Sequence, residues 1–338
     1  MTATLPPVEA FETEDRCARS LLRDLHTPNP RVYWLDLTIT AATGWSAFAL
    51  AATLPFSLAM VGCLLVAVFA LYRGLCFLHE ISHMKRRALR GFEPVWNALF
   101  GFPLLMPSFV YLGVHQAHHS LSTYGTSGDP EYLPFAGSKR MTICFALESF
   151  LIPLALILRF MVLAPVGLLI PPFQKWLVVH ASALTMNFAY TREATPQLIR
   201  KVRRDSTVIL LLWAAAAAIL PLHIFAVWCA ASGLASFVNT LRTLAAHRYE
   251  SNGAPLDRES QLRDSVDVPG NIWTELWAPV GLRYHALHHY FPGVPYHNLS
   301  KAHQRLVAEL PVDSSYRGVT RSGLIDSLRS LGRPASNH

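Results

Sequence analysis

The sequence predicts an all-α integral membrane protein with four transmembrane helices in two hairpins, interfacial helices and a cytoplasmic cap rich in histidine. Three observations carry this prediction. Of the 338 residues, 52% are hydrophobic and only 15% are charged, whereas about 25% of residues are charged in an average soluble domain. Two runs of 36 residues, 37–72 and 206–241, contain no Lys, Arg, Asp or Glu. Eight of the 15 histidines fall in three short segments.

Each charge-free run is expected to form a helical hairpin. A bilayer is crossed by about 20 residues, so a run of this length is too long for one span. Pro55 and Pro221 lie near the middles of the two runs, and proline ends or kinks a helix. If the second helix of each hairpin continues past the run, it carries His79 and His247 out of the hydrocarbon to similar heights.

Two other apolar segments are predicted not to cross. Residues 94–114 are interrupted by two prolines and suggest a re-entrant or interfacial segment. Residues 141–173 contain Glu148 and Arg159 and are too short for two full spans. We expect membrane-embedded or interfacial helices there, because a single crossing would place the last histidine segment opposite the other two.

The charge pattern predicts the orientation and excludes some partners. The net charge is +7, and basic residues follow the first histidine segment and precede the second hairpin. The positive-inside rule therefore places the histidines in the cytoplasm. No nucleic-acid-binding motif accompanies the charge, so no nucleic acid is expected. The five cysteines are scattered without a CxxC pair, which favours a reducing compartment and argues against a thiolate metal site.

We predict one domain over residues 1–338. Residues 1–36 have no basic start or apolar core of a signal peptide and are expected to be a cytosolic lead-in. Residues 37–306 form the membrane and cap core. Residues 307–338 form a C-terminal tail, whose Ser/Gly/Arg-rich end we expect to be mobile.

The histidine segments predict a metal centre. Box one, 79–83, places two histidines four residues apart, hence on one face of a helix. Box two, 115–119, and box three, 285–289, both read HxxHH. Because a zinc or iron ion takes four to six ligands, eight or nine imidazoles indicate two metals, although imidazole alone does not select which. The eight box histidines are His79, His83, His115, His118, His119, His285, His288 and His289, and His247 is the candidate ninth ligand.

The boxes and their spacing resemble the membrane-bound fatty acid desaturase and hydroxylase superfamily. The Gly-Asp-Pro-Glu at 128–131 and the run 285–297 also resemble that family, and the likeness extends over about 37–306. It implies a non-haem centre of two iron ions, with O2 as co-substrate and the eight box histidines as ligands. His247 matches an extra histidine that relatives place after their last span.

The resemblance also suggests groups that orient the ligands. Asp129 and His297 are candidates for fixing imidazole tautomers by hydrogen bonds. A turn-capping aspartate and a polar interfacial histidine are equally good interpretations of the two. Many relatives carry an acidic residue just before the extra histidine, where this chain has Ala246. Glu80 is expected to point away from the two histidines of box one and not to bind metal.

We therefore predict O2-dependent desaturation of an acyl chain, most simply that of an acyl lipid. Hydroxylation of a fatty acyl, carotenoid or alkane substrate is the alternative, since the ligand set does not distinguish the two reactions. Electrons are expected from an external donor of the ferredoxin or cytochrome b5 type, and the basic cytoplasmic face suits an acidic donor.

Two remote alternatives belong to other classes. A membrane zinc protease would use the HExxH of box one with Glu80 as general base, but it leaves six box histidines unexplained. A metal transporter or lipid-binding protein would need ionisable residues within the hairpins, where the two runs have no Lys, Arg, Asp or Glu.

Overall fold

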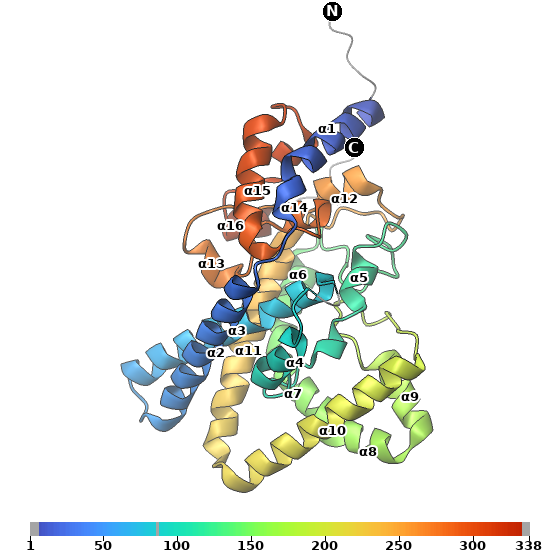
Figure 1. Cartoon of the computed structure of the whole chain (residues 1–338). Helices are drawn as coiled ribbons and strands as arrows, with labels where there is room; N and C mark the ends of the chain where they lie inside the picture. Colours follow the sequence, from blue (N-terminus) through green and yellow to red (C-terminus); the bar gives the residue numbers. More distant parts are fainter. Residues whose placement is uncertain (1–6, 86–87, 333–338) are drawn as a thin grey trace, which may run out of the picture.

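In the computed structural model, described over residues 7–85 and 88–332, the chain is a bundle of long helices capped at one end by short helices (Figure 1). Within these ranges the only β-pairing is four isolated bridges. The predicted all-α class is therefore confirmed.

The first charge-free run forms a closely packed hairpin. Helix α2 (Pro30–Thr53) and helix α3 (Leu58–His83) are joined by a turn that contains Pro55. The Asn29 side chain caps α2, and the Ser57 side chain accepts a hydrogen bond from the Met60 N–H at the start of α3. Serine and asparagine are preferred at such positions because they satisfy free N–H groups of the first turn. Helix α3 runs without interruption to His83, as expected.

The segment after box one enters the bundle and returns. It consists of α4 (Phe92–Trp96), a π-helical turn η2 (Asn97–Gly101), a 3-10 turn η3 (Ser108–Val110) and α5 (Val114–His118). Indole N–H groups satisfy its free carbonyls: Trp45 donates to Leu99, Trp213 to Phe102 and Trp228 to Pro103, at 2.8, 3.2 and 3.0 Å. Irregular backbone is tolerated at membrane depth only where protein groups pair with it, so a re-entrant segment fits these contacts.

The next segment leaves the histidine end and comes back to it. Five consecutive elements lead away from the histidine end: α6 (Lys139–Glu148), the turn η4 (Ser149–Leu151), α7 (Ile152–Ile157), the π-helical turn η5 (Leu158–Leu163) and α8 (Ala164–Leu169). Helix α9 (Pro171–His180) leads back. After α9 the chain reaches the Gly-Asp-Pro-Glu segment that follows box two, where the Met186 N–H donates to the Pro130 carbonyl at 2.9 Å. Box three can therefore lie on the same side as boxes one and two.

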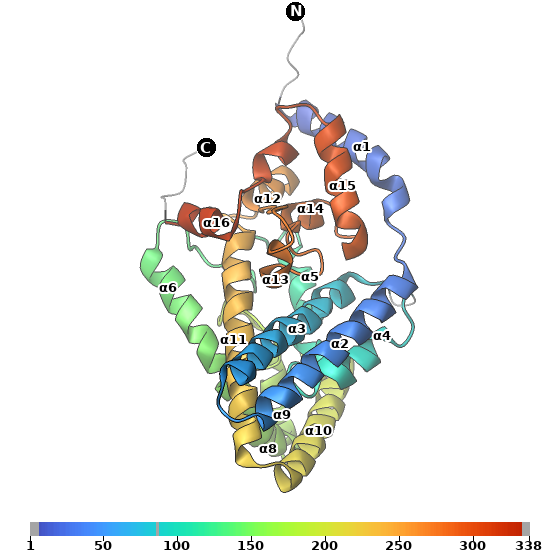
Figure 2. The same cartoon turned by 90° about the vertical axis from the view of Figure 1, so that its left-hand side faces the viewer.

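The second charge-free run also turns at its proline, but its helices diverge. Helix α10 (Pro196–Ile219) and helix α11 (Leu222–Ala246) meet near the turn through the rings of Trp213 and Trp228, 4.7 Å apart, and then separate (Figures 1 and 2). Helix α11 packs on α3, whereas α10 packs on α8 and α9.

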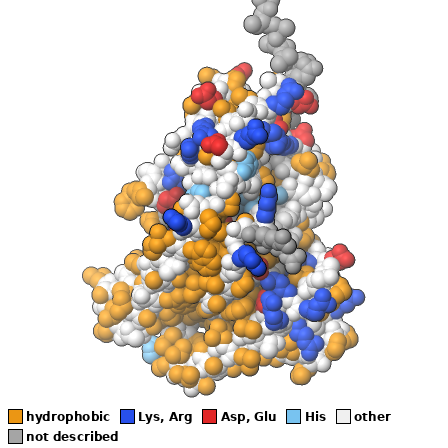
Figure 3. Space-filling model, in the orientation of Figure 1, with side chains coloured by type: hydrophobic (Ala, Val, Ile, Leu, Met, Phe, Trp, Pro, Cys, Tyr) orange, Lys and Arg blue, Asp and Glu red, His pale blue; other side chains and the backbone are white. Residues whose placement is uncertain are grey.

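Four helical segments in the described ranges are long and apolar enough to cross a membrane: α2, α3, Lys139–Leu169 and α11. This indicates an integral membrane protein, and in the space-filling view apolar side chains dominate the lower part of the molecule (Figure 3). These four candidate spans differ from the four that we predicted. Lys139–Leu169, which covers most of the segment expected not to cross, is among them, and α10 is not. Helix α10 begins with a charged stretch, so its charge-free part is only 206–219, short of the roughly 20 residues of a full span.

Short helices complete the cap: α12 (Arg258–Asp264), α13 (Thr274–Trp277), α14 (His285–Tyr290), α15 (Tyr296–Glu309), the 3-10 turn η6 (Ser315–Val319) and α16 (Leu324–Ser330). Helix α1 (Pro7–Leu22) and the turn η1 (Arg23–Leu25) pack on α15, and Arg258 pairs with Asp15 at 3.0 Å. The C-terminal end up to residue 332 is also packed, with Tyr316 fully buried. The Tyr316 hydroxyl donates a hydrogen bond to Asp267, at 2.8 Å. The expected mobility of the Ser/Gly/Arg-rich end stays a prediction.

Candidate metal centre

The structure brings all nine predicted histidines together, although they come from four separate segments of the chain. They form two groups, and within each group one ring nitrogen per residue lies within 4.8 Å of all the others. The five-histidine group is His79, His83, His115, His119 and His288, and the four-histidine group is His118, His247, His285 and His289. Each group has enough nitrogen donors for one transition metal ion.

Local structure explains why the side chains converge. Box one occupies the last two turns of α3, so His79 and His83 share a face. Boxes two and three begin at or near the start of the short helices α5 and α14. His247 follows α11 in an extended conformation. Its Nε2 lies 2.9 Å from Nε2 of His285 and 3.3 Å from Nε2 of His118, so these three ring nitrogens point at one another.

The electrostatics favour neutral imidazoles, the form that binds metals. Burial holds the pKa values of five of them well below the usual value for histidine: His115, His119, His285, His288 and His289. Both ring nitrogens of His79 are buried without a hydrogen-bond partner among the described residues. An unpaired buried polar atom is costly, and a metal ion bound to one of these nitrogens would satisfy it. The donor set therefore fits two metal ions.

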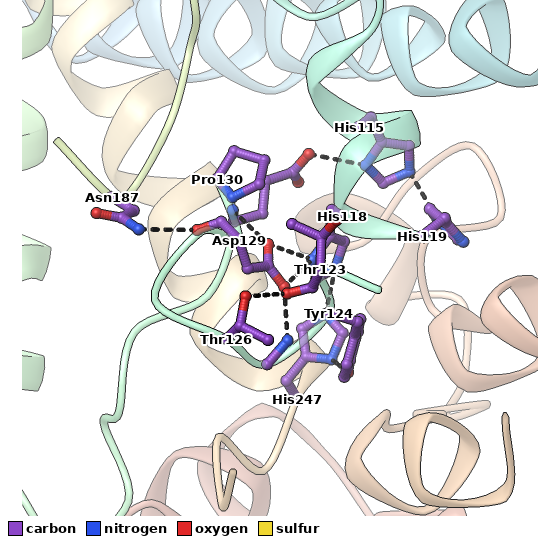
Figure 4. A network of polar contacts seen from close by, with 12 residues as sticks. His115, His118, His119, Thr123, Tyr124, Thr126, Asp129, Pro130, Asn187 and His247 are labelled. Carbon is purple, nitrogen blue, oxygen red and sulfur yellow. Dashed lines mark hydrogen bonds and ion pairs between the residues drawn. The ribbon is translucent and has the colours of Figure 1, made fainter. Parts of the chain in front are cut away.

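Asp129 holds one of the box-two histidines. Its carboxylate accepts from Nδ1 of His118 at 2.9 and 3.0 Å (Figure 4). Burial opposes a charge on His118, but the Asp129 carboxylate raises its pKa above the usual value. Asp129 is completely buried, and it also accepts the Gly125 and Glu131 N–H groups at 2.9 Å. The predicted contact between Asp129 and a box histidine is thus present.

We did not predict from the sequence the carboxylate that holds His115 in the same way. Its Nδ1 lies 2.8 Å from the Glu131 carboxylate and 2.8 Å from the Tyr111 hydroxyl. Burial raises the pKa of Glu131 to about 7. The signal was available, because Glu131 ends the Gly-Asp-Pro-Glu sequence that contains Asp129.

A further missed group replaces the acidic residue that Ala246 does not provide. The Tyr124 hydroxyl lies 2.8 Å from Nδ1 of His247 and donates to the Asp264 carboxylate at 2.9 Å. Asp264 itself lies 3.6 Å from Nδ1 of His247. Tyr124 and His247 are 123 residues apart, and nothing in the local sequence points to their contact.

Two other residues lie outside the histidine cluster. The imidazole Nε2 of His297 accepts the Asn29 N–H at 3.0 Å, a contact between α15 and the start of α2. This contact gives no support to the predicted role of His297 in orienting a ligand. Glu80 accepts hydrogen bonds from the Tyr33 hydroxyl and from the Tyr296 N–H. It points away from the metal groups, as predicted.

Comparisons with known proteins agree with this geometry. The family model "Fatty acid desaturase" matches residues 55–319. The chain is also 42% identical over 325 residues to a protein of Caulobacter vibrioides (strain NA1000 / CB15N) named ceramide hydroxylase, with 94% of this chain and 93% of the relative covered. The remote protease and transporter alternatives find no counterpart in these matches. The chain is an oxidoreductase that belongs to the fatty acid desaturase family.

Proposed function

We propose that the protein hydroxylates the acyl part of a ceramide, using O2 and a diiron centre held by the nine histidines. The observation that carries this proposal is the similarity to a ceramide hydroxylase over nearly the whole of both chains. It favours the hydroxylase alternative over the desaturation that we predicted first. The two groups of buried histidines at the end of apolar helices support a reaction on a membrane lipid.

The proposed reaction balances with an external reductant. One oxygen atom of O2 is inserted into a C–H bond, and the other leaves as water with two electrons and two protons from the donor. When bound, the two iron ions would supply O2 activation and one-electron chemistry. The ligands would be the five-histidine group for one ion and the four-histidine group for the other.

The protein's own residues hold and shield the ligands. Nδ1–H of His118 donates to Asp129, which leaves Nε2 free to face the four-histidine group. Glu131 and Tyr111 do the same for His115, and Tyr124 with Asp264 for His247. Such groups fix the tautomer and orientation of a metal-binding imidazole. The burial of the cluster also keeps bulk water away from the reacting carbon.

The histidine cap is proposed to face the cytoplasm. Exposed basic residues gather at the start of α10, among them Arg200, Arg203 and Arg204 (Figure 3), and positive charge favours the cytoplasmic side. The same surface suits an acidic electron donor of the ferredoxin or cytochrome b5 type. Cys17 on α1 is exposed and offers a native probe. A membrane-impermeant maleimide should label it only after the cells are opened, and labelling of intact cells would contradict this orientation.

Lipid mass spectrometry tests the reaction. Cells that express the chain with a ferredoxin system are compared with cells that express a His118→Ala variant. We expect ceramides to gain about 16 mass units only with the wild-type chain. A loss of about two mass units would return the assignment to desaturation. An unchanged ceramide profile from iron-loaded protein would overturn the proposed substrate.

A further inference from the structure

A stripe of polar side chains follows one face of α11 within its membrane-spanning segment. The stripe consists of Ser232, Ser236, Asn239 and Arg242, spaced so that successive members lie on the same side of the helix. The segment is otherwise apolar, and the 36-residue run before Arg242 has no charged residue. Polar and ionisable residues within a membrane helix are costly and commonly line the path of a substrate.

The lower part of the stripe faces a cavity between helices. Ser232 and Ser236 line a small apolar cavity together with Leu71 of α3, Leu104 of the re-entrant segment and Leu156 of α7. The Ser232 hydroxyl is buried and has no hydrogen-bond partner in the described part of the chain. The cavity therefore offers apolar walls with hydroxyl groups along one side.

The upper end of the stripe is a half-buried cation near the end of α11 that leads to His247. The Arg242 guanidinium donates to the Asn239 side-chain oxygen at 3.1 Å, while its Nε is buried without a partner among the described residues. Arg242 lies near the end of α11, five residues before His247. At about 1.5 Å per residue, this places its backbone roughly 7.5 Å along the helix from that proposed ligand.

This arginine differs from Arg73 on α3. Arg73 is part-exposed and is paired with Asp36 at 2.6 Å and with Glu275 at 3.5 Å. Within the ranges that the structure describes, no carboxylate lies at ion-pair distance from Arg242. A guanidinium has five N–H donors and no acceptor. Only the Nε–H of Arg242 is buried without a partner among the described residues. A buried donor left unpaired is costly, which points to an acceptor that a bound molecule supplies.

We propose that Arg242 and Asn239 bind the amide group of the ceramide and thereby select the carbon that is hydroxylated. This inference rests on the proposed function. Arg242 can donate to the amide carbonyl, and the Asn239 side chain can pair with the amide N–H. Because Arg242 lies next to the histidine cluster, the bound amide places the carbonyl end of the acyl chain at the metal centre, with the rest of the chain directed along the α11 stripe toward the cavity.

Arg242→Met is the first test, measured on purified iron-loaded protein. The matched control is Arg73→Met on α3, because the Arg73 guanidinium is already paired with Asp36 and Glu275. We expect Arg242→Met to keep its iron, to bind a synthetic C16 ceramide at least about tenfold more weakly by native mass spectrometry, and to spread the hydroxyl over several carbons. Arg242→Lys should restore part of the binding. Arg73→Met should hydroxylate the wild-type position.

A second variant and a second lipid keep the test decisive if Arg242→Met does not fold. Asn239→Leu should weaken ceramide binding and broaden the product, while Thr240→Val, its neighbour outside the stripe, should not. An ether analogue without a carbonyl should bind wild type and Arg242→Met equally. A diacylglycerol that binds as tightly as ceramide would show that any acyl carbonyl is recognised and would overturn the amide assignment.

Two failures are distinguishable. Wild-type protein that does not hydroxylate ceramide at all would refute the proposed function. Wild-type protein that hydroxylates one position, together with an iron-loaded Arg242→Met variant of unchanged affinity and position, would overturn the inference and leave the proposed function standing.

Discussion

The two helical hairpins share a sequence pattern but differ in structure. Each contains 36 residues without charge and turns at a proline. Helices α2 and α3 pack closely, with Gly44 against the Leu71 side chain. Helices α10 and α11 separate beyond their turn (Figure 2). A charge-free run with a central proline therefore specifies a turn between two helices, but not whether the helices pack on each other.

The difference comes from the re-entrant segment. The carbonyls of Phe102 and Pro103 accept the indole N–H groups of Trp213 on α10 and Trp228 on α11. Both helices therefore hold the same piece of irregular backbone between them. The small cavity that Ser232 lines also borders this segment. The open hairpin of α10 and α11 thus encloses the re-entrant segment, whereas the closed hairpin of α2 and α3 carries box one at its end.

The two hairpins also present their histidines differently. His79 and His83 belong to a continuous helix. His247 lies beyond the end of α11, where the loop after α12 pairs with it: the Val266 N–H donates to the Ala246 carbonyl at 2.8 Å. Box one is thus positioned by its own helix, and His247 by a tertiary contact.

Removal of the His247 side chain is expected to have the largest effect on bound iron and on activity. His247→Ala leaves three histidines in its group, whereas His79→Ala leaves four in the other. We expect His247→Ala to lose about half of the bound iron and at least about 100-fold in activity. His79→Ala should retain more iron, measured by inductively coupled plasma mass spectrometry on purified protein. Equal iron loss in both variants would contradict the division into two groups.

The second-largest effect on iron binding is expected at the carboxylate that holds His247. Asp264→Asn weakens the contacts of Asp264 with Tyr124 and His247. We expect iron affinity to fall by about 10- to 100-fold, as is typical for groups that orient a metal-binding imidazole. Titration with a competing chelator measures it. Arg263→Gln on the exposed side of α12 is the control, and an equal loss there would assign the effect to helix α12 as a whole.

Glu80 tests the closed hairpin. Glu80→Ala removes the acceptor that links Tyr33 of α2 and the Tyr296 N–H of α15 to α3. We expect the free energy of unfolding to fall by about 2 kcal/mol, seen as a lower Tm in detergent, with iron retained. Glu80→Gln, which keeps an acceptor, should lose less. Loss of all iron in Glu80→Ala would refute the separation of Glu80 from the metal site.

The smallest effect is expected at the open hairpin. Trp228→Phe leaves the Pro103 carbonyl without its donor while retaining an aromatic ring. We expect a loss of about 1 kcal/mol in unfolding free energy, measured as a shift in Tm. Trp273→Phe is the matched control because Trp273 is 70% exposed. A shift of the same size in the control would exclude a specific role for the Trp228 hydrogen bond.

The sequence by itself determined the helical class, the two turns and the nine histidines that meet. These follow from local rules: charge-free length, proline position, and the periodicity that puts residues four apart on one face of a helix. The continuation of α3 to box one was predictable for the same reason. Asp129 was also within reach, because it lies close to box two in the chain.

Only the tertiary structure decided how the helices pair and which side chains hydrogen-bond to each ligand histidine. The separation of α10 from α11 depends on two indole contacts with a segment more than 100 residues away in the chain. The contacts of His247 with Tyr124 and Asp264 likewise join distant parts of the sequence. Periodicity describes neighbours along one helix, whereas these contacts depend on packing between elements, which no local pattern encodes.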